Sequence, residues 1–168
     1  MSHISFRNRV GNHPVAAFFL LAYAISWLGF LPTIAGFDSA FGGINLLIAQ
    51  FGPAIAGFLT LWYTGGSIRE WASRIVRWRV PLRWWLITIA IPIFVFGTTS
   101  VGFTLLGYQP ELSRLPDPLT TFLPTLIGLS LLAGLGEEPG WRGFGLPKLQ
   151  VRYGALGGTL ILGTVWAL

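Results

Sequence analysis

The chain has 168 residues, of which 53% are hydrophobic and only 10% are charged, and its formal net charge is +5. A soluble domain carries about 25% charged residues, so this composition excludes a water-soluble globular protein and indicates lipid around most of the surface. The sequence has no cysteine, which excludes disulfides, thiol catalysis and cysteine-ligated metal centres. The basic residues lie between apolar runs, so we interpret them as signals for topology and anionic lipid, not for nucleic acid.

Four apolar runs are long enough to cross a bilayer, which takes about 20 helical residues. We predict membrane helices at residues 14–35, 42–63, 84–107 and 119–136, and a fifth, truncated helix from about Gly154. The predicted fold is therefore all-α, a polytopic transmembrane helix bundle over residues 14–168 that follows a cytoplasmic tail of residues 1–13.

Prolines and glycines inside these runs fit a membrane bundle. Pro53, Pro92 and Pro124 lie within predicted helices, where neighbouring groups in a bundle can satisfy the backbone carbonyls that a proline frees. Gly154 and Gly158 form a small-xxx-small pair, which predicts the close approach of another helix.

The charges between the runs predict the orientation. Basic residues concentrate before the first run, between the second and third, and after the fourth: Arg7, Arg9, Arg69, Arg74, Arg77, Arg79, Arg83, Lys148 and Arg152. The loop between the third and fourth runs carries Glu111, Arg114 and Asp117. The positive-inside rule then predicts a multi-pass plasma-membrane protein with its N-terminus and its arginine-rich loop in the cytoplasm.

The arginine-rich loop also has a helical pattern. Trp71, Ile75 and Trp78 recur at helical spacing within residues 68–80, and arginines occupy other positions. A basic segment with a tryptophan stripe is typical of a helix that lies on the membrane surface. The alternative is an ordinary basic loop.

The candidate catalytic residues lie in residues 136–143, GEEPGWRG, at the end of the fourth run. Charged groups at membrane depth are costly, so they predict a functional site. Glu138 and Arg142 are four residues apart, which on a helix favours an ion pair and leaves Glu137 free to act as a general base. The alternative is that both carboxylates are solvated at the cytoplasmic interface and that Arg142 is one more topology charge.

The stretch GEEPGWRGFGLPKL, residues 136–149, resembles the first motif of the CAAX-protease and bacteriocin-processing family of intramembrane proteases. That motif has two glutamates, three further residues and an arginine, commonly with a tryptophan before the arginine and a glycine after it. The Leu-Pro-x-Leu at 146–149 and the run at 157–168 are also typical of bacterial members. The resemblance covers the last third of the chain in detail, and the rest in layout only.

The resemblance implies an endopeptidase that hydrolyses peptide bonds of membrane-tethered peptides or proteins, in a cavity open to the cytoplasm. Glu137 is similar to the residue that activates the attacking water, and Glu138 and Arg142 are similar to its supporting neighbours. The resemblance implies no firm cofactor. A divalent metal such as zinc, held by glutamate and histidine, is the alternative to a metal-free mechanism.

One departure from the family concerns histidine. The family's second motif is an aromatic residue followed four positions later by histidine; Trp166 matches the aromatic residue, and the histidine falls two positions beyond Leu168. The two histidines of the chain, His3 and His13, precede the first run and are interpreted as ordinary surface residues. We therefore expect a fragment that is incomplete at its C-terminus and inactive alone. The alternative is a non-catalytic membrane scaffold or immunity protein that keeps the fold.

Overall fold

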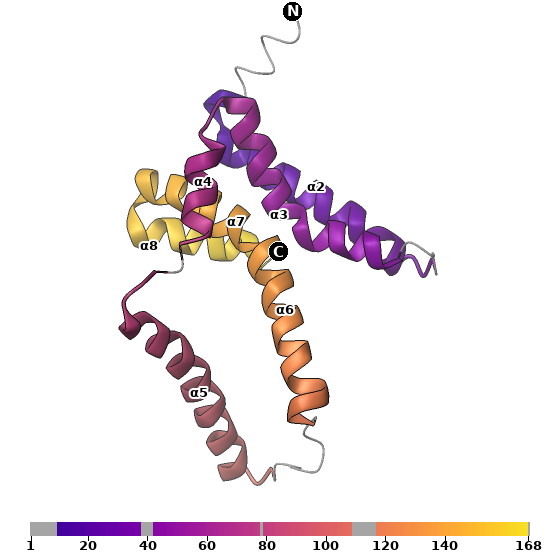
Figure 1. The fold of residues 1–168 in the computed structure, drawn as a ribbon, viewed down its shortest axis with the longest axis vertical. Coiled ribbons are helices and arrows are strands. Elements are labelled where there is room, and N and C mark those ends of the chain that lie inside the picture. The colour runs from indigo at the N-terminus through magenta and orange to yellow at the C-terminus, as the bar shows by residue number, and fades with distance from the viewer. Residues whose placement is uncertain (1–9, 38–41, 78, 109–116, 168) are drawn as a thin grey trace, which may run out of the picture. The chain divides into compact units, whose positions relative to one another are not determined.

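A computed structural model describes residues 10–37, 42–77, 79–108 and 117–167. Within these ranges the regular elements are helices and no strand occurs (Figure 1). Four helical stretches, beginning at Pro14, Gly42, Leu82 and Thr120, are long and apolar enough to cross a membrane. The prediction of an all-α, multi-pass membrane protein is therefore confirmed. The chain forms two compact units, Met1–Val76 with Thr125–Leu168, and Arg77–Pro124.

In the first unit, α2 (Pro14–Ile34) and α3 (Gly42–Thr64) run side by side (Figure 1). Their contact depends on small residues, because a Cβ atom at Gly29 would lie 2.7 Å from the backbone nitrogen of Ala49. Ser26 adds a polar contact, since its hydroxyl donates to the carbonyl of Ala49 at 2.8 Å. Such small-residue interfaces, with a hydroxyl bonded across them, are the usual means by which membrane helices associate.

The short helix α4 (Ile68–Ile75) follows α3 after a tight turn. Gly65, with φ +74°, ends α3 in a conformation that other residues adopt at a cost. The Ser67 hydroxyl then accepts from the backbone N–H of Glu70 at 3.1 Å, and Glu70 forms an ion pair with Arg74. The helix covers the first part of the predicted surface helix, whereas Trp78 lies outside the described residues.

The rest of the first unit is a chain of short helices: α6 (Leu123–Gly136), α7 (Glu138–Gly140), the π-helical turn η3 (Trp141–Gly145) and α8 (Leu146–Trp166). Pro124 is the second residue of α6 and follows the π-helical turn η2 directly, so it lies within the helical stretch that begins at Thr120, as the sequence predicted.

The helix α8 reverses direction at Gly154, whose φ of 73° and ψ of 174° are not helical. The arms 146–153 and 155–166 lie against each other, because a Cβ atom at Gly158 would be 2.8 Å from the backbone nitrogen of Gln150. The second arm coincides with the predicted fifth helix. Of the predicted small-residue pair, Gly158 makes a close approach to the other arm, whereas Gly154 forms the turn.

The core of the first unit lies around η3. Phe18 of α2 is fully buried, with its ring centroid 5.3 Å from that of Trp141 and 5.1 Å from that of Phe144. Leu149 and Leu162, one from each arm of α8, complete this cluster with Ala22 and Ala56. The segment that follows the two glutamates is therefore the most enclosed part of the unit.

The second unit contains α5 (Leu82–Leu105) and the π-helical turn η2 (Pro118–Phe122). No residue of α5 is buried, and Pro92 lies inside it. Asp117 precedes η2, and its side chain accepts from the backbone N–H of Thr120 at 2.7 Å. The predicted outer-loop residues Glu111 and Arg114 lie outside the described residues, as do Arg7, Arg9 and His3.

Candidate active site

The two glutamates lie at a helix junction. The backbone N–H of Glu137 still donates to Ala133 of α6 at 3.0 Å, and its carbonyl accepts from Gly140 and Trp141, each at 3.0 Å. The π-helical turn η3 begins immediately afterwards. Departures from α-helical geometry of this kind are frequent at functional sites, because they redirect side chains that a regular helix would place elsewhere.

Two glycines bring this junction into direct contact with α3. A Cβ atom at Gly136 would lie 2.6 Å from the carbonyl oxygen of Gln50, and one at Gly140 would lie 2.2 Å from that of Pro53. On the opposite side of the contact, a Cβ atom at Gly57 would touch the Cα of Gly140 at 3.4 Å. Glycines four residues apart thus press the segment that carries Glu137 and Glu138 against the backbone of α3.

The carboxylate of Glu137 accepts a hydrogen bond on each oxygen. Gln50 of α3 donates through Nε2 to Oε1 at 2.5 Å, and Trp166 of α8 donates through Nε1 to Oε2 at 3.1 Å. The side chain is half-buried. Both donors are neutral side chains, and they hold the carboxylate from two helices that are far apart in sequence.

Glu138 contacts a different partner. Its carboxylate forms an ion pair with Arg142, so the predicted contact between residues four apart is present. The side chains are 43% exposed for Glu138 and 65% exposed for Arg142. Both line a cavity of about 420 Å³ together with α4 and α6 residues such as Arg74 and Ser130. The adjacent glutamates therefore have separate environments.

The end of α4 supports the same segment. The indole Nε1 of Trp71 donates to the carbonyl oxygen of Pro139 at 2.9 Å and lies 3.0 Å from the position that a Cβ atom of Gly143 would occupy. The sequence pattern had assigned Trp71 to a membrane-facing stripe. In the structure its polar atom is used inside the protein, which anchors α4 beside the glutamates.

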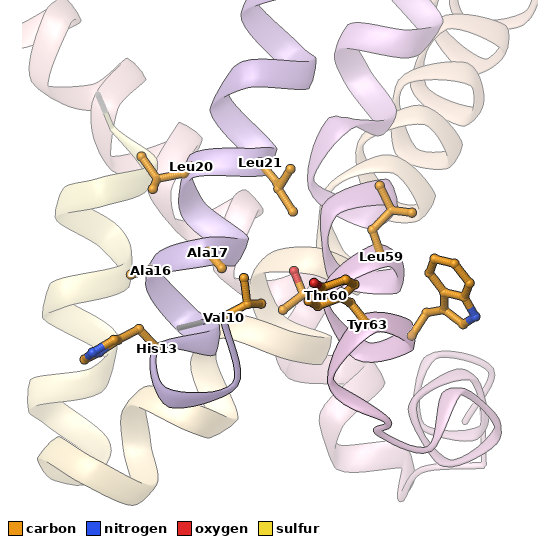
Figure 2. A pocket seen from close by; sticks show the side chains of 10 residues that line it. Val10, His13, Ala16, Ala17, Leu20, Leu21, Leu59, Thr60 and Tyr63 are labelled. Carbon is orange, nitrogen blue, oxygen red and sulfur yellow. The ribbon is translucent and has the colours of Figure 1, made fainter. Parts of the chain in front are cut away.

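The described histidine lies elsewhere. His13 lines a groove of about 570 Å³ between the start of α2 and the end of α3, and Figure 2 shows it with the apolar side chains around it. The groove is larger than the cavity of about 420 Å³ that Glu138 lines, but neither glutamate lines it. Volume alone is therefore a poor guide to the chemistry of this chain.

The described residues do not fit a metal ion at Glu137. Zinc sites in proteins use at least three side-chain ligands, and no group of three such side chains occurs in the described part of the chain. In addition, each oxygen of Glu137 already faces an N–H donor, whose hydrogen would repel a cation.

Comparison with known proteins identifies the segment. Residues 118–168, from η2 to the end of α8, match the family model of type II CAAX prenyl endopeptidase Rce1-like proteins. The chain is also 25% identical over 163 residues to CAAX prenyl protease 2 of Methanococcus maripaludis, which covers 90% of this chain. Over this C-terminal segment the chain is therefore similar to CAAX prenyl endopeptidases.

The alignment spans 59% of the length of the archaeal relative. No solved structure matches the chain. The segment that matches the family model includes Glu137, Glu138, Arg142 and Trp166, whereas Gln50 lies outside it. The sequence motif therefore leads to the carboxylate and to one of its two donors.

Sequence reasoning missed Gln50. One signal was available, because Gln50 and Asn45 are the amide side chains of an otherwise apolar membrane helix. Polar residues inside such helices usually face the bundle or a site. The sequence does not show which of the two amides reaches Glu137, because the contact joins residues 87 positions apart.

Proposed function

We propose that the protein is an intramembrane endopeptidase of the CAAX type and that Glu137 is its general base. The observation that carries this proposal is the carboxylate of Glu137, which is half-buried in a membrane bundle and oriented by donors from α3 and α8. The matched family model and the relative are both described as CAAX prenyl proteases, which supports peptide-bond hydrolysis as the reaction.

In the proposed reaction, Glu137 takes a proton from a water molecule while the water oxygen bonds to the scissile carbonyl carbon. The carbon–nitrogen bond then breaks, and Glu137 returns the proton to the departing amine. The carboxylate can do this because each of its oxygens accepts one hydrogen bond in the structure and retains a second lone pair for the water.

Glu138 and Arg142 have supporting roles in this proposal. Their ion pair neutralises a charge directly beside Glu137, and it lines the cavity of about 420 Å³ from which a peptide can approach. The metal-dependent mechanism remains the alternative, in which a divalent ion such as zinc activates the water. Removal of divalent ions by a chelator distinguishes the two, because the proposed mechanism predicts that activity survives.

The substrate and its location follow from the membrane fold. A protein with several apolar helices meets its substrates at or within the bilayer, so we propose membrane-tethered peptides or proteins as substrates. We also propose a plasma-membrane location with the N-terminus in the cytoplasm, since basic residues concentrate in alternate loops.

The test compares two glutamine variants of the complete gene product in liposomes. Glu137→Gln keeps the shape of the side chain and removes the base, so cleavage of a library of membrane-anchored peptides should fall by about 10²-fold or more. Glu70→Gln is the control, because Glu70 is an exposed carboxylate of α4 that pairs with its helix neighbour Arg74. It should cleave at the wild-type rate.

Two results would contradict the proposal. Cleavage by Glu137→Gln at the wild-type rate would show that another group activates the water. Absence of cleavage by the folded wild-type protein across the library would favour the non-catalytic scaffold or immunity protein that the sequence left open.

A further inference from the structure

Gln50 lies where the backbone of α3 contacts the segment of the two glutamates. Its backbone carbonyl is 2.6 Å from the position of a Cβ atom at Gly136, and its side-chain amide reaches the carboxylate of the next residue, Glu137. Gln50 is therefore held by its backbone and its side chain at once. A side chain fixed in this way can set the orientation of its partner with little freedom.

The chemistry of the contact also specifies which atoms meet. An ionised carboxylate only accepts hydrogen bonds, so the NH₂ group of Gln50 must face it. The donor is neutral, which orients the carboxylate without forming the ion pair that occupies its neighbour Glu138. The second donor, Trp166, holds the other oxygen and so restricts rotation about the bond to the carboxyl group.

We propose that Gln50 is a positioning residue, which aims the carboxylate of Glu137 at the attacking water. This inference rests on the proposed function, because it assigns Gln50 a role in the same proton transfer. A simpler role is that of an adhesive contact between two membrane helices, which amide side chains often provide. A positioning residue affects kcat even in a variant that stays folded, whereas a purely adhesive contact affects stability and leaves the kcat of the folded protein unchanged.

The first variant is Gln50→Leu, which preserves approximate size and removes the donor. Loss of orientation should lower kcat by roughly 10- to 100-fold with little change in KM, because misplacement of a catalytic group by about 1 Å has effects of this size. Asn45→Leu is the matched control on the same helix, and it should retain the wild-type kcat. An unchanged kcat in Gln50→Leu would overturn the inference.

The second variant is Gln50→Glu, which keeps the shape and adds a titratable group. When the introduced carboxyl group is protonated it donates to Glu137 as the amide does, and kcat should recover. When it ionises, two negative charges repel each other at this distance, so activity should be lost as the pH rises. Asn45→Asp, the matched control, should keep the pH profile of the wild type.

Other charged groups do not differ between these variants. The elements packed around Glu137 carry the following titratable or charged residues: Tyr23, Tyr63, Arg69, Glu70, Arg74, Glu138, Arg142, Lys148, Arg152 and Tyr153. A loss of activity at high pH that appears only in Gln50→Glu is therefore due to the introduced carboxyl group. Thermal unfolding at each pH checks that the variant remains folded, and an alkaline limit shared with the wild type would count against the inference.

A spectroscopic readout separates this inference from the proposed function. The infrared carboxylate bands of Glu137, obtained as the difference between the wild type and Glu137→Gln, report its hydrogen bonds without turnover. They should shift in Gln50→Leu and not in Asn45→Leu. If the bands do not shift, Gln50 is not the partner, whether or not the protein cleaves peptides. If cleavage is normal in Glu137→Gln, the base is wrong even where the bands shift.

Discussion

The helices α3 and α5 have similar lengths and similarly apolar sequences, yet they differ in how they are packed. Six residues of α3 are buried, and all are small or of medium size: Ala49, Gly52, Pro53, Ala56, Gly57 and Thr60. No residue of α5 is buried, although its sequence includes many large aliphatic and aromatic side chains. In a membrane, apolar character shows only that a helix tolerates lipid, whereas a face of small residues allows another backbone to approach.

The largest expected effect is the change in reporter location from one side of the membrane to the other across α5. A topology reporter fused after Arg79, before α5, should be cytoplasmic, and one fused at position 111, after α5, should be on the other side, because basic residues stay inside. Reporter activity in cells gives a yes-or-no result. Both reporters on one side would show that α5 does not span. A reversed pair would place Glu137 on the outside.

The second prediction compares one glycine at the α3 contact with one on α5. A methyl group at Gly140 would lie 2.2 Å from the carbonyl oxygen of Pro53, so Gly140→Ala should destabilise the fold by about 1–3 kcal/mol through overpacking. Gly97 of α5 has no atom within 4 Å of that position, and Gly97→Ala should leave stability unchanged or slightly raised. Unfolding in mixed micelles measures both, and equal losses would refute the contrast between the helices.

The smallest expected change in stability concerns two tryptophans, Trp71 in α4 and Trp84 near the start of α5. Trp71→Phe removes the donor to the Pro139 carbonyl and should cost about 0.5–1.5 kcal/mol. Trp84, at the start of α5, is half exposed, and Trp84→Phe should change stability by less than about 0.5 kcal/mol. The same unfolding assay applies. If Trp84→Phe lowered the free energy of unfolding more than Trp71→Phe does, the conclusion that α5 is the less packed helix would be wrong.

The sequence predicted the helices well because a membrane-spanning helix can be recognised from its length and apolar composition. The runs at 14–35 and 42–63 coincide with α2 (Pro14–Ile34) and α3 (Gly42–Thr64) to within one residue at each end. The third prediction began two residues late, at Trp84 instead of Leu82, since Arg83 interrupts the apolar pattern there. The fifth helix predicted from about Gly154 also coincides with the last arm of α8, although Gly154 itself forms the turn and not the predicted helix contact.

The site was less accessible to sequence reasoning. The spacing of Glu138 and Arg142 predicted their contact, because a helix fixes neighbours four residues apart. Gln50 and Trp71 were not predicted, since each contact depends on how helices distant in sequence pack together. For Trp71 the pattern was misleading as well, because an indole that faces lipid and one that bonds a buried carbonyl have the same sequence signature.

The reversal at Gly154 also bears on the order in which the chain completes its site during synthesis. Trp166 is 29 residues from Glu137 and reaches it through a local hairpin, whereas Gln50 is 87 residues away on a helix that is made much earlier. A nascent chain therefore has α3 in the membrane before either glutamate is translated. The carboxylate gains its second donor only when the second arm of α8 has emerged and folded back, so Trp166 reaches Glu137 later than Gln50 can.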